Sequence, residues 1–364
     1  MEKRKAITSS QLFVMLFVSC MVVSMTYGNM FVGSSELWDH IISALMALFA
    51  TWLILVPIYR LFLIDEKMNV FDNAGDLCGK FGFIIIGVYT FYFLVISVHT
   101  LGIFEKFITG SINPPISVPL LSILLIVSSC YGAYKGIEAL ARTSGFIFVA
   151  MTILIIFFIL SLLPAVEPIN CKPFMYYGQG YVFEGLKFMI SQSSCIPALA
   201  VLMPMARGKC KKGIIFWNLG IYIIFAALVY LIIGTMGDFA VTQIFPVYTA
   251  AGIGKFGSFK HLDSVYLGIW ISGIFIKLSL FLMLAGEGVK KIFGEKFRKI
   301  SVVVFSGMLA IFAFFENKLD FTSGELFENI LLWFLLLLAV VIPTFLIILK
   351  VIKARRGIVK VEKS

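Results

Sequence analysis

The sequence predicts an all-α polytopic membrane protein with about ten transmembrane helices. Of its 364 residues, 60% are hydrophobic and only 14% are charged, and the mean hydropathy is +1.00. A water-soluble chain of this length has no means of hiding so much apolar surface. Apolar runs of about 20 residues, the length that crosses a bilayer as a helix, recur along the whole chain.

The predicted helices follow one another with short connections. Their ranges are 11–32, 38–63, 81–104, 116–134, 143–164, 183–205, 213–236, 264–287, 300–316 and 328–350. The first begins after the basic segment MEKRK and contains LFVSC, which together resemble a signal peptide with a lipoprotein cleavage site at Cys20. Its apolar stretch is longer than the core of a signal peptide, so we expect it to remain as the first span.

The distribution of basic residues orients these helices. The formal net charge is +10, and 23 of the 30 lysines and arginines fall in the segments on one side of the ten spans, against five on the other. Because cytoplasmic loops are enriched in Lys and Arg, we expect an even number of spans with both termini in the cytoplasm. The positive charge therefore serves orientation, and we expect no nucleic-acid partner.

Motifs for catalysis or metal binding are weak in this sequence. The six cysteines lie mostly in spans or on the reducing side, and the three histidines lack metal-ligand spacing. GIGKFG has the glycine spacing of a dinucleotide fingerprint, but it falls in a predicted external loop instead of a strand-to-helix turn. We therefore expect no enzyme, no metal ion and no cofactor.

Two spans are predicted to be broken. The first contains SCMVVSMTYGN and the sixth contains SQSSCIPALAVLMP, in which Pro197 removes a backbone donor and breaks or kinks the helix. The candidate ligand-binding residues from these two spans are Ser24, Thr26, Gly28, Ser193 and Ser194. A plainer interpretation is that small polar residues only allow the helices to pack closely.

The first and sixth spans occupy matching positions if the chain is a five-plus-five inverted repeat. The two repeats are then residues 1–166 and 167–364, forming one transmembrane domain. Broken helices at corresponding places in two halves indicate a transporter-type binding site. The third span is expected beside them and adds Tyr89, Tyr92 and His99 as candidate ligand-binding residues, although aromatic side chains in spans are often plain packing.

The eighth span, LGIWISGIFIKLSLFLML, carries Lys277 near its middle. Helical spacing places Tyr266, Trp270, Gly273 and Lys277 on one face, which we expect to look into the bundle. Ionisable groups inside a membrane are functional by default, so Lys277 joins the candidate ligand-binding residues. The alternatives are a structural lysine paired with a carboxylate such as Glu184, one that reaches the membrane surface, or one that burial leaves neutral.

Three segments carry a family resemblance. ITSSQLFVMLF, YGAYKGIEALAR and FPVYTAAGIGKFGSFKHLDSVYLGIWISGIFIKLSLF resemble the spore-germination permease family, the B-subunit type of nutrient germinant receptors. That family is similar in fold to the amino acid–polyamine–organocation transporters. The resemblance implies a receptor subunit in the inner membrane of the spore that senses a small nutrient, an amino acid for example. Its partners would be an A subunit and a lipoprotein C subunit.

The resemblance also gives Lys277 a role. In transporters of this fold, the eighth span lies against the broken first span where a coupling sodium ion binds. The hypothesis is that the Lys277 ammonium replaces that cation and binds carbonyls freed near Ser19 to Ser24. Two other functions stay open from sequence: a working secondary transporter of an amino acid or similar solute, and a scaffold subunit that binds no ligand.

Overall fold

Helices make up nearly all of the secondary structure of the computed structural model, which describes residues 6–26, 35–112, 117–171, 179–254, 262–319 and 325–355. They are α1 Ser9–Ser24, α2 Leu37–Ile64, α3 Val70–Cys78, α4 Gly82–Phe107, α5 Val118–Lys135, α6 Ile137–Leu162, α7 Gly180–Ser191, α8 Ile196–Leu202, α9 Cys210–Met236, α10 Pro246–Ile253, α11 Leu262–Phe293, α12 Glu295–Leu319, α13 Glu325–Leu336 and α14 Ile342–Arg355. Two short strands, β1 Ile7–Thr8 and β2 Ala206–Arg207, pair in parallel.

The predicted spans are found in the structure. Within the described ranges, nine helical segments are long and apolar enough to cross a membrane, and α1 is a shorter apolar helix. The chain is therefore an all-α, multi-pass integral membrane protein, as the sequence predicts. The first span is shorter than expected, because α1 ends at Ser24 and residues 27–34 lie outside the described ranges. The sixth span is two helices, α7 and α8.

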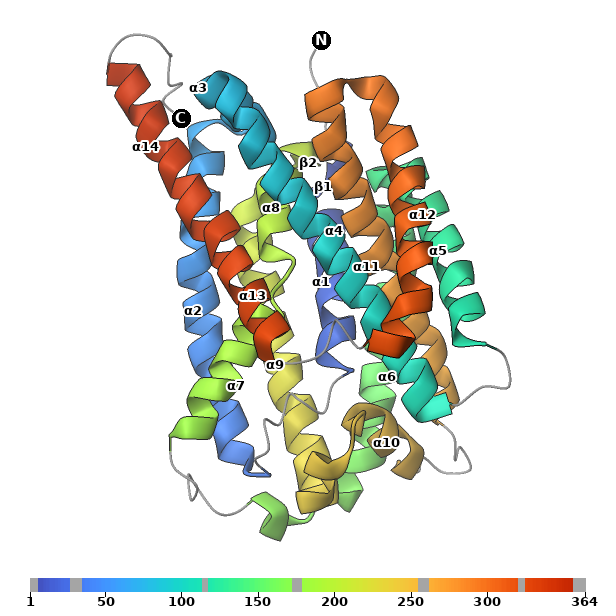
Figure 1. Ribbon diagram of the computed structural model, residues 1–364. Coiled ribbons are helices and arrows are strands. Elements are labelled where there is room, and N and C mark those ends of the chain that lie inside the picture. The colour runs from blue at the N-terminus through green and yellow to red at the C-terminus, as the bar shows by residue number, and fades with distance from the viewer. Residues whose placement is uncertain are drawn as a thin grey trace.

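The long helices pack side by side, and α11 lies at the centre of the bundle (Figure 1). It contacts α1, α4, α5, α6 and α12. Every residue from Ile276 to Gly286 is buried. A helix that is covered all round by protein has no lipid-facing side, so polar groups on α11 meet other helices and not hydrocarbon.

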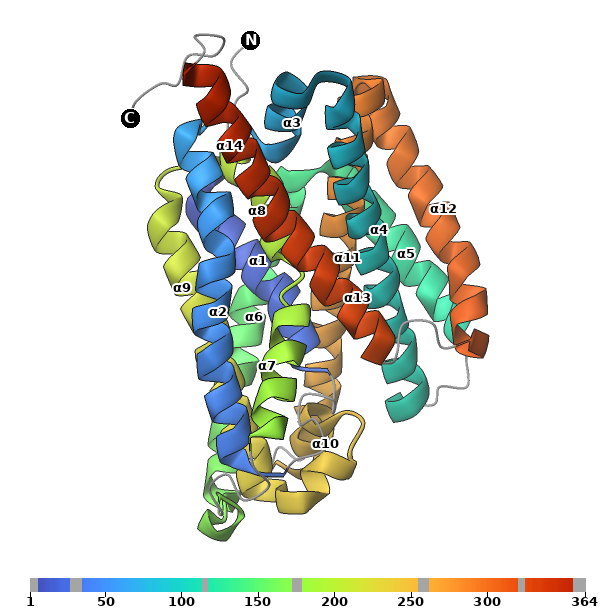
Figure 2. The same cartoon turned by 60° about the vertical axis from the view of Figure 1, so that its left-hand side comes forward.

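One end of the bundle gathers the basic residues. The start of α1, the end of α2, the start of α9 and the end of α14 all lie there (Figures 1 and 2). We call this the basic end, defined by Arg60, Lys67, Arg207, Lys211, Lys212, Lys290, Lys291, Lys350 and Lys353. The described parts of the first and last spans therefore reach the same side, as an even number of crossings requires.

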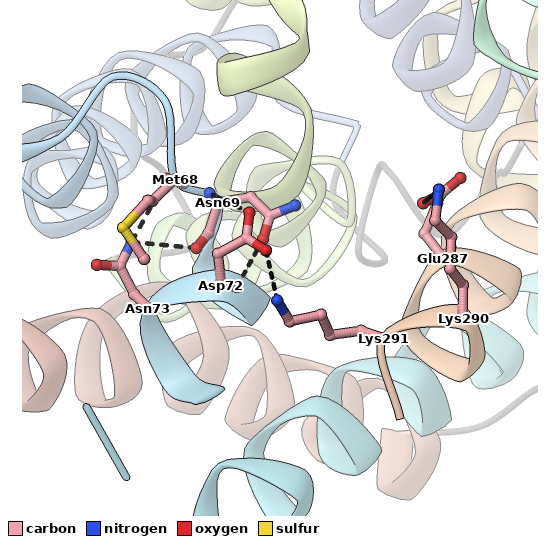
Figure 3. A network of polar contacts seen from close by, with 7 residues as sticks. All are labelled: Met68, Asn69, Asp72, Asn73, Glu287, Lys290 and Lys291. Atoms are coloured by element: carbon pink, nitrogen blue, oxygen red, sulfur yellow. Dashed lines mark hydrogen bonds and ion pairs between the residues drawn. The ribbon is translucent and has the colours of Figure 1, made fainter. Parts of the chain in front are cut away.

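Helix α3 at the basic end was not predicted from the sequence. Asn69 and Asp72 form a capping box that starts the helix. The Asp72 carboxylate faces Lys291 at the end of α11, with Oδ1 2.7 Å from Nζ (Figure 3). From the other side, Lys350 of α14 donates a 3.0 Å hydrogen bond to Oδ1 of Asn73. Helix α3 is thus held between the central helix and the last helix.

We expect the basic end to face the cytoplasm. Alkaline phosphatase, which is active only outside the cell, should be active when fused after Asn170 and inactive when fused after Lys209. The expected orientation follows from the excess of Lys and Arg at one end. A fluorescent protein that folds only inside should give the opposite pattern at the same two positions. An inactive phosphatase after Asn170 would contradict this orientation.

Candidate ligand site at the helix breaks

The sixth span is interrupted between α7 and α8, at residues Gln192 to Cys195. Its backbone turns there, with the Ser193 N–H bonded to the Ile190 carbonyl and the Ile196 N–H bonded to the Ser193 carbonyl, both at 3.0 Å. Pro197 is the second residue of α8, a position where its missing N–H costs nothing. The predicted break is confirmed, and Pro197 begins the second half-helix instead of kinking a continuous one.

The end of α1 lies against α11. The helix is regular to Ser24, after which Met25 and Thr26 form a turn. The carbonyl of Met25 accepts a 2.5 Å hydrogen bond from the Tyr266 hydroxyl, and the Thr26 hydroxyl accepts one of 2.8 Å from Nε1 of Trp270. Both aromatic residues thus satisfy polar groups where the first helix stops. The Ser24 side chain and the whole of Gly28 lie outside the described part of the chain.

The predicted inward face of α11 is confirmed. Tyr266 and Trp270 bind the end of α1, and one turn further on Gly273 lets the two helices approach closely. A Cβ atom built on Gly273 would lie only 2.0 Å from Cγ2 of Val22 in α1. Since valine branches next to its backbone, that methyl group has little freedom to move aside. Lys277 follows on the same face.

Lys277 joins α11 to the break of the sixth span. Its side chain is 1% exposed, and Nζ donates a 3.2 Å hydrogen bond to Oγ of Ser194. The Phe281 ring lies on the same side, with its centroid 6.0 Å from Nζ. The thiols of Cys20 and Cys195 also lie close enough to interact with the ammonium. A buried group with formal charge thus sits where α1, α11 and the α7–α8 break meet.

Three interpretations of Lys277 from the sequence are wrong. The ammonium does not bind carbonyls of Ser19 to Ser24, because α1 is still helical there and the Met21 carbonyl accepts from the Met25 N–H at 3.0 Å. It does not pair with Glu184 either, since that side chain lies on the exposed face of α7. The third alternative, a lysine reaching the membrane surface, does not fit its burial.

The three candidate residues of the third span, now α4, separate into two groups. The Tyr92 hydroxyl donates a 3.2 Å hydrogen bond to the Ser194 carbonyl, so it joins Lys277 at the break. Tyr89 instead donates to the carbonyl of Leu338, in the π-helical turn between α13 and α14, at 2.5 Å. The His99 ring lies 5.4 Å from that of Phe327 in α13. Tyr89 and His99 therefore contact the last span.

A small cavity of about 40 Å³ lies beside the break. Ser193 lines it, and its hydroxyl donates a 3.0 Å hydrogen bond to the Met189 carbonyl. Cys20 lines it from α1, and Trp217 and Tyr222 line it from α9. Roughly 10–15 Å³ is needed for one water, so a cavity of this size has room for a few waters at most. This space is smaller than an amino acid.

Two hydrogen-bond donors at this cavity have no acceptor among the described residues. They are Nε2 of Gln192 and Nε1 of Trp217, both on residues that line the cavity. A buried donor without a partner costs about 1–3 kcal/mol. Sequence analysis missed Trp217, although a tryptophan beside Asn218 in an apolar span is a polar signal. Asn218 itself is satisfied by Thr51 of α2, 3.1 Å away.

Ion pairs connect helices at the basic end of the bundle. A cavity of about 490 Å³ lies there, lined by α3, the end of α11 and the Pro204–Met205 segment after α8. Besides Asp72 and Lys291, the Lys290 Nζ lies 2.7 Å from a Glu295 carboxylate oxygen. Figure 3 shows Lys290 beside Glu287 on α11, on the opposite side of the view from Asp72. These bridges connect α3, α11 and α12 at the basic end.

Comparisons with known proteins agree with this architecture. A family model described as "Spore germination protein" matches residues 6–322. The chain is 25% identical over 313 residues to Spore germination protein KB of Bacillus subtilis (strain 168), covering 81% of each. It is 24% identical over 259 residues to the putative spore germination protein YfkT of the same strain, covering 68% of this chain and 69% of that one.

A solved structure shares the fold. It is described as the substrate-bound outward-open state of a Na⁺-coupled sialic acid symporter. The TM-score is 0.61 at 12% sequence identity, and the match covers 96% of this chain and 84% of the symporter. At this identity the similarity concerns the fold alone, and it confirms a transporter-like helical architecture.

Replacing Gly273 by alanine should destabilise the protein, because the new methyl group meets Val22. Overpacking of this kind costs about 1–3 kcal/mol, measurable as a lower thermal-unfolding midpoint of the purified protein. Gly268→Ala on the same helix is the matched control, since nothing lies within 4 Å of a Cβ there. Adding Val22→Ala to Gly273→Ala should restore the midpoint. Equal midpoints for the two glycine variants would contradict the close approach of α1 and α11.

Bulky replacement at the break should weaken the response to ligand. Ser194→Leu removes the acceptor of Lys277 and places a bulky side chain at a buried position, and Ser193→Leu narrows the small cavity. We expect normal membrane levels and a dose response shifted to higher ligand concentration. Ser191→Leu, at a buried serine bonded within α7 to the Phe188 carbonyl, controls for general disturbance of the helix. Unchanged dose responses in both test variants would place the site elsewhere.

Proposed function

This chain belongs to the spore germination protein family, and we propose that it is the membrane-embedded B-type subunit of a nutrient germinant receptor. In this proposal a small nutrient, an amino acid or a related carboxylate, binds where α1, α11 and the α7–α8 break meet. Binding separates these helices and triggers spore germination. The candidate ligand-binding residues are those of the two breaks, Tyr92 and Lys277.

The observation that carries the proposal is the hydrogen bond from Lys277 to Ser194. An ammonium has three donors, and in the described part of the chain Nζ makes one hydrogen bond. A lone hydroxyl is a poor partner for a buried charge, whereas a carboxylate forms a charge-assisted bond. Lys277 therefore favours a ligand with an anionic end, held where the half-helix α8 begins.

The donors beside the break support the same ligand class. Gln192 and Trp217 offer N–H groups that have no acceptor among the described residues. A carboxylate or carbonyl oxygen of the ligand would satisfy them and remove the cost of leaving them unpaired. Because the cavity holds only about 40 Å³, the ligand must displace α1 or α8 to enter. In a receptor, that displacement of a helix would transmit the binding of the ligand.

The Na⁺-coupled symporter of the same fold favours a second function, a working secondary transporter of an amino acid or similar solute. We prefer sensing because the family model that the chain matches is described by spore germination. A third possibility, a scaffold subunit, predicts no ligand binding.

The remaining parts of the proposal concern the setting of the protein. Residues 1–166 and 167–364 form the two inverted five-helix repeats of a single transmembrane domain. Both termini lie in the cytoplasm, and the membrane is the inner membrane of the spore. An A subunit and a lipoprotein C subunit complete the receptor. Each of these follows from the family and from the charge bias at the basic end.

Binding and flux measurements on the purified protein separate the three functions. A thermal-shift screen against common amino acids, nucleosides and sugars should identify a ligand that raises the unfolding midpoint. Proteoliposomes containing the protein should then bind that ligand without accumulating it. Accumulation driven by an ion gradient would support the transporter, and the absence of any thermal shift would support the scaffold.

Lys277→Met should abolish the response to ligand while the protein still accumulates in the membrane. Methionine keeps much of the length of lysine and loses the charge, so the packing of α11 is preserved. We expect the thermal shift with ligand to disappear and the midpoint without ligand to remain. Lys80→Met, at an exposed lysine before α4, is the control. A normal response in Lys277→Met, or its failure to accumulate, would rule out this role.

A further inference from the structure

An apolar groove runs along the outside of the bundle between α2 and α9, which lie side by side (Figure 2). Its volume is about 300 Å³. The residues that line it are Trp52, Leu55, Val56, Tyr59, Lys211, Ile214 and Ile215. They follow helical spacing on both walls, four on α2 and three on α9, so the groove is continuous along the helix axes. We call it the α2–α9 groove.

The groove has one charged end. Lys211 is the second residue of α9, and Tyr59 is five residues before the last residue of α2, so both lie at the basic end. Trp52 marks the other end, seven residues deeper along α2. At 1.5 Å per residue that depth is about 10 Å, within the roughly 15 Å of hydrocarbon in one leaflet. The groove thus extends from the membrane surface into a single leaflet.

We propose that the α2–α9 groove binds an anionic phospholipid of the bilayer. The acyl chain lies along the apolar walls, and the phosphate of the headgroup contacts the Lys211 ammonium. Tyr59 sits at the level where amphipathic aromatic rings are favoured at a membrane interface. Basic pockets between helices at this level are typical sites for anionic headgroups.

Charge and position argue for an anionic lipid over other occupants. Arg60 follows Tyr59 on α2, and Lys209 and Lys212 lie close to Lys211 in sequence, so this end of the two helices carries several positive charges. Each lysine or arginine near an anionic surface adds about 1 kcal/mol of attraction. A transmembrane helix of a partner subunit is apolar at this depth and gains nothing from Lys211. The groove shares no lining residue with the small cavity beside the break.

Lipid retention in nanodiscs tests this site. The purified full chain is reconstituted with a mixture of phosphatidylglycerol and phosphatidylcholine, and the bound lipid is measured by native mass spectrometry. The wild type should retain phosphatidylglycerol preferentially. Lys211→Gln should lower that preference about five-fold, the equivalent of the ~1 kcal/mol per basic residue. Lys80→Gln, at an exposed lysine outside the groove, should leave it unchanged.

A groove-filling variant and a cross-link complete the test. Val56→Trp should reduce retention of both lipids, because the side chain occupies the path of the acyl chain. A photoreactive amino acid at Val56 in native membranes should form adducts with lipid. An unchanged preference in Lys211→Gln, or adducts with another polypeptide in place of lipid, would overturn the proposal.

Discussion

The rest of this structure depends on one constraint: a polar group inside a membrane needs a partner within the protein. The break at Gln192 to Cys195 interrupts a transmembrane helix and frees backbone groups that lipid has no means of satisfying. Tyr92 of α4 binds the Ser194 carbonyl, and Lys277 of α11 binds the Ser194 hydroxyl. These two hydrogen bonds stabilise the break when no ligand is bound. A ligand that replaces either bond therefore changes the structure of the break.

The same constraint explains the position of α11. A helix that carries Lys277 at mid-depth has to be covered by protein, and α11 is buried from Ile276 to Gly286. Gly273 brings α1 close enough for Tyr266 and Trp270 to satisfy its last turn. At the basic end, Lys291 of the same helix binds Asp72 of α3. One helix therefore connects the candidate ligand site with the network of ion pairs at that end of the bundle.

Much of the fold is predictable from the sequence because a bilayer imposes a length and a polarity on each element. Hydropathy located the spans, Pro197 and the serines before it indicated the break, and helical spacing gave the inward face of α11. The hydrogen-bond partner of Lys277 was not predictable in the same way. Lys277 binds Ser194 and not the end of α1, because α1 stays helical through Ser24, and a helix end is not defined by propensity inside a membrane.

Tertiary contacts account for the other differences. Tyr89 and His99 share a span with Tyr92, yet they contact the last span. Which helix packs against each face of α4 depends on segments that are distant in sequence. Helix α3 is too short to be recognised by hydropathy. Its capping box lies beside Lys291 and Lys350, and these contacts, which hold the helix in place, are visible only in the structure. Trp217 is one of several aromatic residues in apolar spans, and only its place beside the break distinguishes it.

Amide hydrogen exchange with and without a ligand that triggers the response is the most direct test of a site at the broken helices. Exchange is slow where an amide is bonded and buried, and a ligand slows it further where it binds. The account predicts that ligand changes exchange at Gln192 to Cys195 and at Met25 and Thr26, with little change in α12. Ligand-dependent protection confined to other parts of the chain, with the break unaffected, would contradict it.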